Sequence, residues 1–574
     1  ANRGNMAMLW CYFNSVDFVL IQPRQTGKSV STDCLMVDLI YILAMNTEIS
    51  LITKDDSLRK GNVERLKKIR RLLPKYLVPL NKADTDNQFE LTCKALGNKY
   101  TTGVAQNSEF AANNLGRGST TPTRHIVSVL DNEMKEVASV EQDYIPGGDR
   151  MINIDFFPYQ DFCYLIYQYQ KKNVVYCMAA KVDGMGNIAG NPVEMDTTHL
   201  GFAANNKIYS VITNEDKSKI MAFKINTKNK RSYLLSTKLF DNKLSLLKES
   251  RLPIEMEERN EYLGVFQLDN MGNLVFSKFL RANNDNINTA QLMMKPAYSD
   301  SIVVASLNIE KTWLDEVHIK IDNTNQRYLL TSLYYKERRG NIDGYYFYVW
   351  DTKIGAPYVD TVYTFPEDLR RDARGDASFK GAFNDFFIRN IIIRKDGGFV
   401  IGSESYYTTS RFNNWNRWDY LYGQPYFNSF GNNYYSPYYN NYWMNNSRFN
   451  NNQSVRYHAD NIVVNSFSDK GMPEWDNVLG KNQFDDASDD LMSYQMVNTG
   501  GSLHFLFNLQ ERRNNLLTDY SIAPDGQLYR NPTLKNLDKG YDFLPKYGKQ
   551  VSSKVLIIPC AYRNYICFAK VEYN

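Results

Sequence analysis

The segment QLDNMGNLVF (residues 267–276) places Asp, Asn and Gly between two apolar flanks. These residues suit a tight turn that joins two β-strands. The same arrangement recurs from about residue 125 onward, in VLDNEMKEV (129–137), KVDGMGNIAG (181–190), IRKDGGFVI (393–401), SFSDKGMPEW (466–475) and IAPDGQLYR (522–530), with weaker members at 225–235 and 321–330. The segments therefore predict a long series of β-hairpins.

The spacing of these turns indicates the architecture of this part of the chain. Where the turns are clear they recur at roughly 45–75 residues, which is typical of four-stranded propeller blades. We predict that residues 125–574 form a large all-β domain, a β-propeller of about seven blades. A pair of large β-sandwiches would give similar turns and is the alternative.

One insertion interrupts the repeated pattern at residues 411–452. It is built almost wholly from Asn, Tyr, Phe and Trp. Because aliphatic residues are lacking, the favoured interpretation is a disordered or loosely packed segment between two strands of a blade. The alternative is an aromatic stacking surface for single-stranded nucleic acid or glycan, which the scarcity of Lys and Arg disfavours.

The N-terminal quarter follows a different pattern, with strands at 18–21 and 48–53 and helices at 29–45 and 57–77. Alternating strands and helices predict a parallel sheet covered on both faces. The second helix is amphipathic and strongly basic. Residues 1–124 carry 17 Lys and Arg against 11 Asp and Glu, a net charge of +6, although the whole chain has a net charge of only +4.

The cysteine and histidine content and the hydropathy of the chain argue against metal sites, disulfides and membrane spans. The seven cysteines show neither C-x-x-C pairs nor Cys/His ligand spacing, so the sequence predicts reduced thiols rather than a zinc site or a disulfide framework. The five histidines are scattered and are interpreted as loop or core residues. No apolar run is long enough for a transmembrane helix, and the first residues lack a secretion signal. Localisation is left open.

The stretch FVLIQPRQTGKSV (18–30) carries the most specific motif. It fits the phosphate-loop pattern G-x-x-x-x-G-K-[ST] between a strand and a helix, except that Gln22 occupies the first glycine position. Backbone N–H groups at the start of the helix would cradle phosphate. The predicted ATP phosphate-binding residues are Gln25, Thr26, Gly27, Lys28 and Ser29, with Ser29 as a Mg²⁺ ligand and Mg-ATP as the cofactor.

This loop resembles that of phage terminase large subunits, which often lack the first glycine and carry an R-Q-x-G-K-[ST] core, here residues 24–29. Segments 51–77 and 113–123 are similar to the family's second strand, basic helix and the approach to its acidic motif. The resemblance covers residues 10–124 and implies that Arg24 and Lys28 are catalytic residues of an ATPase. It further implies double-stranded DNA and the phage portal as partners, and a cytoplasmic location. The remainder resembles uncharacterised bacterial β-propeller-type repeat proteins.

The sequence shows no clear match for the acidic residues that work with a phosphate loop. A P-loop ATPase needs an Asp for Mg²⁺ and a Glu to activate water. The nearest candidates are Asp131 and Glu133 in IVSVLDNEMKEV (126–137). However, residues 130–132 match residues 268–270, so a turn residue is the favoured interpretation of Asp131. No nuclease domain of the terminase type is evident after residue 125.

The sequence therefore supports two functions. The first is a terminase-like nucleotide-binding segment (1–124), with an ATPase machinery that we expect to be incomplete, fused to a β-propeller-like domain (125–574). The second is a non-enzymatic β-propeller scaffold or binding protein, in which the P-loop segment is a relic or the product of an artefactual fusion. The ligand of the propeller, protein or glycan, stays open.

Overall fold

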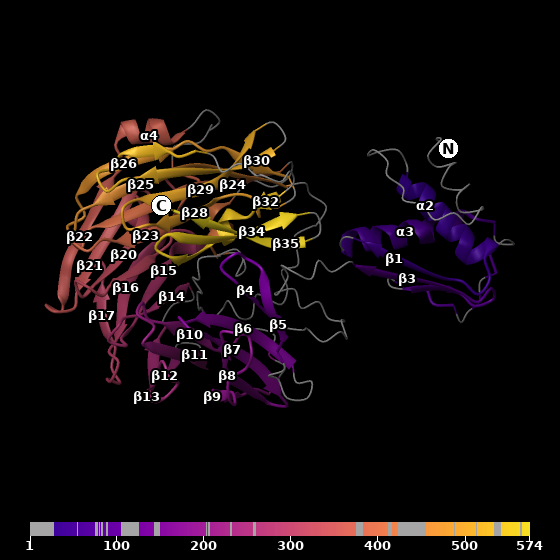
Figure 1. Ribbon diagram of the computed structural model, residues 1–574, viewed down its shortest axis with the longest axis horizontal. Coiled ribbons are helices and arrows are strands. Elements are labelled where there is room, and N and C mark those ends of the chain that lie inside the picture. The colour runs from indigo at the N-terminus through magenta and orange to yellow at the C-terminus, as the bar shows by residue number, and fades with distance from the viewer. Residues whose placement is uncertain are drawn as a thin grey trace. The chain divides into compact units, whose positions relative to one another are not determined.

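The computed structural model describes two compact units, which span residues 28–104 and 126–573 (Figure 1). The predicted boundary at 124/125 lies outside the described residues. No helix among the described residues is long and apolar enough to cross a membrane. The described ranges are 28–53, 56–74, 78–104 without 80, 82–83 and 88–89, 126–142, 150–374 without 202–203, 205–206, 230–231 and 257–259, 383–410, 416–422, 455–532 without 487 and 512–513, and 541–573 without 563–564.

The N-terminal unit packs two helices against a three-stranded sheet in the order β1-β3-β2. Strand β1 coincides with the predicted strand and runs parallel to β3, whereas β2 and β3 form an antiparallel pair that the sequence analysis did not predict. The predicted strand at 18–21 lies outside the described residues. The elements are α2 (Lys28–Asp38), η1 (Leu39–Leu43), β1 (Glu48–Thr53), α3 (Asp56–Leu72), β2 (Glu90–Cys93) and β3 (Asn98–Val104).

The first predicted helix is shorter than expected, because an α-helix ends at Asp38 and a π-helical turn follows. The buried Asn98 explains this ending. Its amide nitrogen donates to the carbonyl oxygens of Leu39, Ile40 and Ala44 at 3.2, 2.9 and 2.7 Å, so these carbonyls need no partner further along a helix. The second helix likewise ends five residues before the predicted Leu77.

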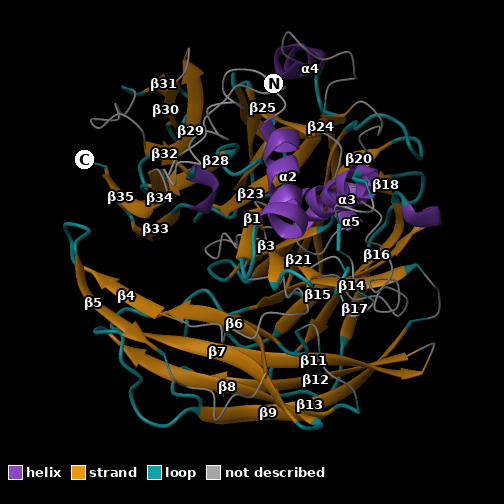
Figure 2. Ribbon diagram, turned by 90° about the vertical axis from the view of Figure 1, so that its right-hand side faces the viewer, coloured by secondary structure: helices purple, strands orange, loops and turns teal. Residues whose placement is uncertain are grey.

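The second unit is a β-propeller, as predicted. Six consecutive sheets follow the hairpin β4–β5 (Ile126–Leu130, Glu136–Glu141), and the nine-stranded sheet among them contains two four-stranded units, so the described residues form seven blades. Strand order within the blades follows the sequence, except in the last. Figure 2 shows this order in the first blade, at the bottom of the view. The blades are β6–β9 (Arg150–Pro158, Phe162–Lys171, Val174–Asp183, Val193–His199), β10–β13 (Ser210–Thr213, Lys219–Asn229, Ser232–Asp241, Leu246–Glu255), β14–β17 (Glu261–Leu268, Leu274–Arg281, Ile287–Lys295, Val303–Ser306), β19–β22 (His318–Asp322, Arg327–Tyr335, Gly344–Asp351, Ala356–Thr364) with β18 (Trp313–Leu314), β23–β26 (Phe386–Ile393, Phe399–Ser410, Val455–Phe467, Pro473–Leu479) with β27 (Gln483–Asp485), β28–β31 (Tyr494–Asn498, Leu503–Glu511, Asn514–Ile522, Leu528–Arg530) and β32–β35 (Tyr541–Phe543, Lys549–Ser552, Val555–Tyr562, Tyr565–Glu572).

All six clearly predicted turns share one backbone geometry, which confirms that they are equivalent. In each, the first residue donates its N–H to the carbonyl four residues later, and the fourth residue donates back to the first. The fourth residue has a positive φ in every case, a conformation that favours glycine. These residues are Met134, Gly186, Gly272, Gly397, Gly471 and Gly526, with φ of 64°, 84°, 90°, 85°, 76° and 86°.

Successive blades pack face to face through apolar layers. The inner strands β10, β14, β19 and β23 contact one another in that order. Between the fourth and fifth blades, Phe347 of β21 meets Phe399 of β24 with ring centroids 4.9 Å apart. Lys570 of the last blade donates to the Asn132 carbonyl at 3.1 Å, although 438 residues separate them in sequence. The turn of the β4–β5 hairpin therefore contacts the last blade.

Among the described residues of this unit, two α-helices lie outside the strand pattern. Helix α4 (Glu367–Arg374) lies between β22 and β23 in the sequence, and it buries Leu369 and Ala373. Helix α5 (Arg417–Tyr422) lies inside the 411–452 insertion. It buries Leu421 and Tyr422, so the prediction of a loosely packed insertion is wrong for this part. Residues 411–415 and 423–454 lie outside the described residues.

Candidate functional site

The predicted phosphate loop falls largely outside the described residues. Gln22, Arg24, Gln25, Thr26 and Gly27 all belong to the segment before α2. Lys28 and Ser29 are the first two described residues of α2. The Mg-ATP site and the catalytic role of Arg24 stay predictions.

Asp131 lies in the turn between β4 and β5. Its Oδ1 accepts hydrogen bonds from the backbone N–H groups of Glu133 at 2.8 Å and Lys135 at 2.9 Å. Asp183 and Asp241 make the same pair of bonds in their own turns. Asp131 thus has the role of a turn residue, and its assignment as a Mg²⁺ ligand stays a prediction.

A buried ion pair anchors α5 in the propeller. The Nε of Arg417 lies 3.1 and 3.0 Å from the two carboxylate oxygens of Asp315, and its Nη2 also contacts Oδ2. The side chains are 9% and 1% exposed. The guanidinium lies 3.9 Å from the centre of the Phe387 ring, and its Nη1 donates to the Asn384 carbonyl. Because Asp315 precedes β19 and Asn384 precedes β23, this one side chain joins two blades.

Tyrosine hydroxyls complete the surroundings of Asp315. Tyr335 donates to its Oδ1 at 3.2 Å, and Tyr422 of α5 donates to its backbone carbonyl at 3.0 Å. Burial raises the pKa of both tyrosines well above the usual value, and the negative charge of Asp315 adds to this. They therefore act as neutral donors. The guanidinium of Arg281, from the third blade, lies 3.7 Å from the Tyr422 ring centre.

A second buried cluster lies in the fifth blade. Glu404 is fully buried, with its Oε1 2.8 Å from Nζ of Lys481 and its Oε2 3.3 Å from Nε of Arg389. Burial alone would raise the pKa of Glu404, but the two cations outweigh it and lower the pKa. Burial lowers the pKa of Lys481 against the opposing effect of Glu404. Arg389 also donates to the hydroxyl of Tyr420 in α5, so the two clusters are neighbours.

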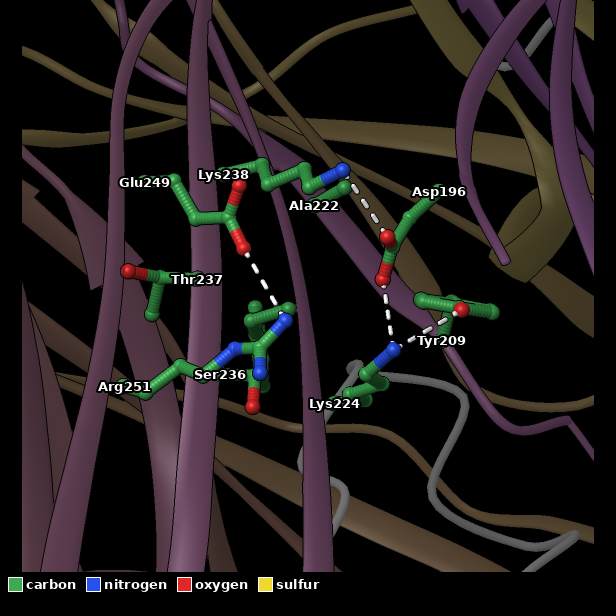
Figure 3. Close-up of a pocket in the computed structure, with 10 residues that line it drawn as sticks. Asp196, Tyr209, Ala222, Lys224, Ser236, Thr237, Lys238, Glu249 and Arg251 are labelled. Carbon is green, nitrogen blue, oxygen red and sulfur yellow. Dashed lines mark hydrogen bonds and ion pairs between the residues drawn. The ribbon is translucent and has the colours of Figure 1, made fainter. Parts of the chain in front are cut away.

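A small polar pocket lies between the first two blades (Figure 3). Asp196 accepts from Lys224 at 2.6 Å through one oxygen and pairs with Lys238 at 2.9 Å through the other. Lys224 further donates to the hydroxyl of Tyr209 at 3.1 Å. The cavity volume of about 10 Å³ is enough for one water molecule. The charges here pair with one another, which favours a structural role.

Sequence reasoning missed the residues that the structure brings together. Arg417 and Asp315 are 102 residues apart, and no motif connects them. In the segment FDDASDDL (484–491), Asp486 pairs with Arg456 and Asp489 pairs with Lys546. Within the described ranges, no group of three or more His, Cys, Asp or Glu side chains is placed to hold a metal ion.

Comparison with known proteins gives fold likenesses only. No protein-family model and no curated protein sequence matches the chain. Among solved structures, an ulvan lyase of polysaccharide lyase family PL25 is 10% identical, covering 73% of this chain and 91% of its own, with a TM-score of 0.34. The β-propeller domain of the Trilobed protease from Pyrococcus furiosus is 9% identical, covering 75% and 95%, with a TM-score of 0.33. A putative 6-phosphogluconolactonase from Bacteroides fragilis is 10% identical, covering 72% and 96%, with a TM-score of 0.29.

Proposed function

We propose that the protein is a β-propeller binding or scaffold protein whose ligand surface is built on α5 and the Asn/Tyr-rich segment after it. The main support for this proposal is the buried Arg417–Asp315 ion pair, which anchors α5 to the propeller. Fixing one end of a recognition segment lowers the conformational entropy that binding must remove.

The composition of this segment supports recognition of a glycan. Tyrosine and tryptophan rings offer flat apolar faces with a polar edge, and asparagine amides both donate and accept hydrogen bonds. Rings of this kind add contact area at a low entropic cost. Few charged residues accompany them in residues 424–452, which favours a neutral ligand over a polyanion. A protein ligand is the alternative outcome of the test.

The test replaces residues 424–452 with a short Gly/Ser linker and leaves Arg417–Tyr422 in place. Wild-type protein and variant are compared by native electrophoresis through gels that contain single soluble polysaccharides, neutral or acidic. We expect a neutral polysaccharide to retard the wild type and not the variant, while the thermal unfolding midpoint is unchanged. Equal retardation of both proteins would contradict the assignment of the surface, and no retardation at all would exclude these glycans.

We further propose that the N-terminal unit binds nucleotide phosphate through residues 22–29. The helical position of Lys28 and Ser29 and the parallel pairing of β1 with β3 support this. The terminase-type roles of Arg24 and of DNA and portal partners are finer predictions that rest on the family resemblance alone.

Replacing Lys28 with alanine should weaken binding of a fluorescent ATP analogue by about 10-fold or more, because the ammonium that reaches the phosphates is lost. The exposed Lys94 offers a matched control, since Lys94→Ala removes the same charge from the same unit. Fluorescence anisotropy measures the affinity of each full-length variant for the ATP analogue. Equal affinity for wild type and Lys28→Ala would remove the phosphate-loop assignment.

A further inference from the structure

Three side chains in the sixth blade form a hydrogen-bonded chain outside the surface proposed above. The Oγ of Ser502 lies 2.8 Å from Nε2 of His504, and Nδ1 of His504 lies 3.0 Å from Oδ2 of Asp519. Ser502 ends the turn between β28 and β29, His504 belongs to β29, and Asp519 belongs to β30. Ser502 directly precedes β29 and His504 is its second residue, so extended backbone places the two side chains on one face.

The order of the contacts matches a nucleophile, a base and an orienting carboxylate. A carboxylate at Nδ1 holds the proton on that nitrogen and leaves Nε2 as the acceptor of the serine proton. The carboxylate is itself held, because the Nδ2 of Asn531 donates to Oδ2 of Asp519 at 2.8 Å. The ring of Tyr573 packs on the imidazole with centroids 4.3 Å apart. The side chains of His504 and Asp519 are 12% and 10% exposed.

The serine lies beside an open stretch of backbone. Gly500 and Gly501 are exposed, and no described atom beyond the adjacent residues of the chain lies within 4 Å of the position that a Cβ on either would take. Gly500 has a φ of 86°, which only glycine adopts without strain. Among the described residues, the N–H of Gly501 donates no backbone hydrogen bond, so a donor next to Ser502 is available for an oxyanion.

We propose that Ser502, His504 and Asp519 form an acyl-transfer site that hydrolyses small, unhindered carboxylic esters. Ser502 Oγ gives its proton to His504 Nε2 and bonds to the ester carbonyl carbon. The bond from this carbon to the leaving oxygen then breaks, and the alcohol takes the proton from His504. Water next gives a proton to His504 and attacks the acyl-serine, which releases the acid and restores Ser502. Asp519 is a positioning residue that acts through His504.

Two measurements on the full chain test this site. The first is labelling with a fluorophosphonate probe followed by peptide mass spectrometry. A fluorophosphonate phosphonylates an activated serine and releases fluoride, so we expect the adduct on the peptide that contains Ser502. The second is hydrolysis of p-nitrophenyl acetate, for which we expect Ser502→Ala and His504→Gln to lose about 100-fold or more in kcat/KM.

Ser553→Ala is the matched control, because Ser553 is an exposed turn serine of the neighbouring blade. It should leave labelling and hydrolysis unchanged. Asp519→Asn should lower kcat and shift the pH–rate profile, and Asp519→Glu should restore part of the rate, which a purely structural role would not produce. Labelling of the wild type does not depend on any variant folding. A wild type whose Ser502 is not labelled, or a folded Ser502→Ala that hydrolyses ester at the wild-type rate, would overturn the proposal.

Discussion

Replacing Arg417 with methionine is expected to lower the free energy of unfolding of the propeller unit by about 3–5 kcal/mol, because it leaves the buried Asp315 carboxylate without its cation. Asp315 is 1% exposed, so water cannot take over the role of the guanidinium. The variant also loses the contact of Arg417 with the Phe387 ring and the bond to the Asn384 carbonyl. Urea unfolding followed by tryptophan fluorescence measures the change in the transition of this unit.

Two further variants distinguish the destabilisation caused by an unpaired buried charge from the general effect of replacing an arginine. Arg456→Met removes a guanidinium that pairs with Asp486 at the surface, where both side chains are well exposed, so little change is expected. The double variant Arg417→Met with Asp315→Asn should recover part of the loss, since the unpaired charge is gone. An Arg417→Met protein as stable as the wild type would show that α5 is not anchored by this pair.

Replacing Glu404 with glutamine should destabilise the same unit by about 3–5 kcal/mol at neutral pH. It keeps the size of the side chain but leaves the buried cations Lys481 and Arg389 without their counter-charge. The variant Lys481→Met, which removes a cation instead, tests the other side of the pair. If the double variant Glu404→Gln with Lys481→Met is more stable than either single variant, the two side chains stabilise each other in the wild type.

The pH dependence gives an independent test of Glu404. Its pKa in the folded protein lies below the ordinary 4.5, because Lys481 and Arg389 outweigh the effect of burial. The stabilisation is therefore complete above about 4.5 and is lost as the pH falls through the lower folded pKa. Urea midpoints measured through this acidic range should fall less steeply for Glu404→Gln than for the wild type. Parallel curves would contradict a lowered pKa.

The propeller was predictable from the sequence because its turns repeat a local chemistry. Asp or Asn near the start and Gly at the fourth position satisfy the turn by themselves, as Asp183 and Gly186 do. Local signals of this kind do not depend on the rest of the fold. The match of residues 130–132 with residues 268–270 predicted in the same way that Asp131 lies in a turn.

The anchored helix was not predictable in this way. Helix α5 has six residues, which is too short for a periodic pattern, and it is held by Asp315 and by rings from other blades. Tertiary contacts thus override a local composition that indicated disorder. The antiparallel β2–β3 pair was likewise not predicted, because the alternation of strands and helices indicates only parallel strands. The Ser502–His504 pair did carry a signal, because the two residues are two positions apart at the start of a strand, but Asp519 becomes their neighbour only through strand register.

Amide hydrogen exchange of the full chain tests most directly whether the start of the Asn/Tyr-rich insertion is built into the propeller. Exchange is slow where backbone hydrogen bonds are buried and fast where a segment opens readily. We expect amides at the C-terminal end of α5, next to the buried Leu421 and Tyr422, to exchange nearly as slowly as those of β23, and Arg417→Met to speed their exchange selectively. Exchange of α5 at the rate of an exposed loop in the wild type would contradict this expectation.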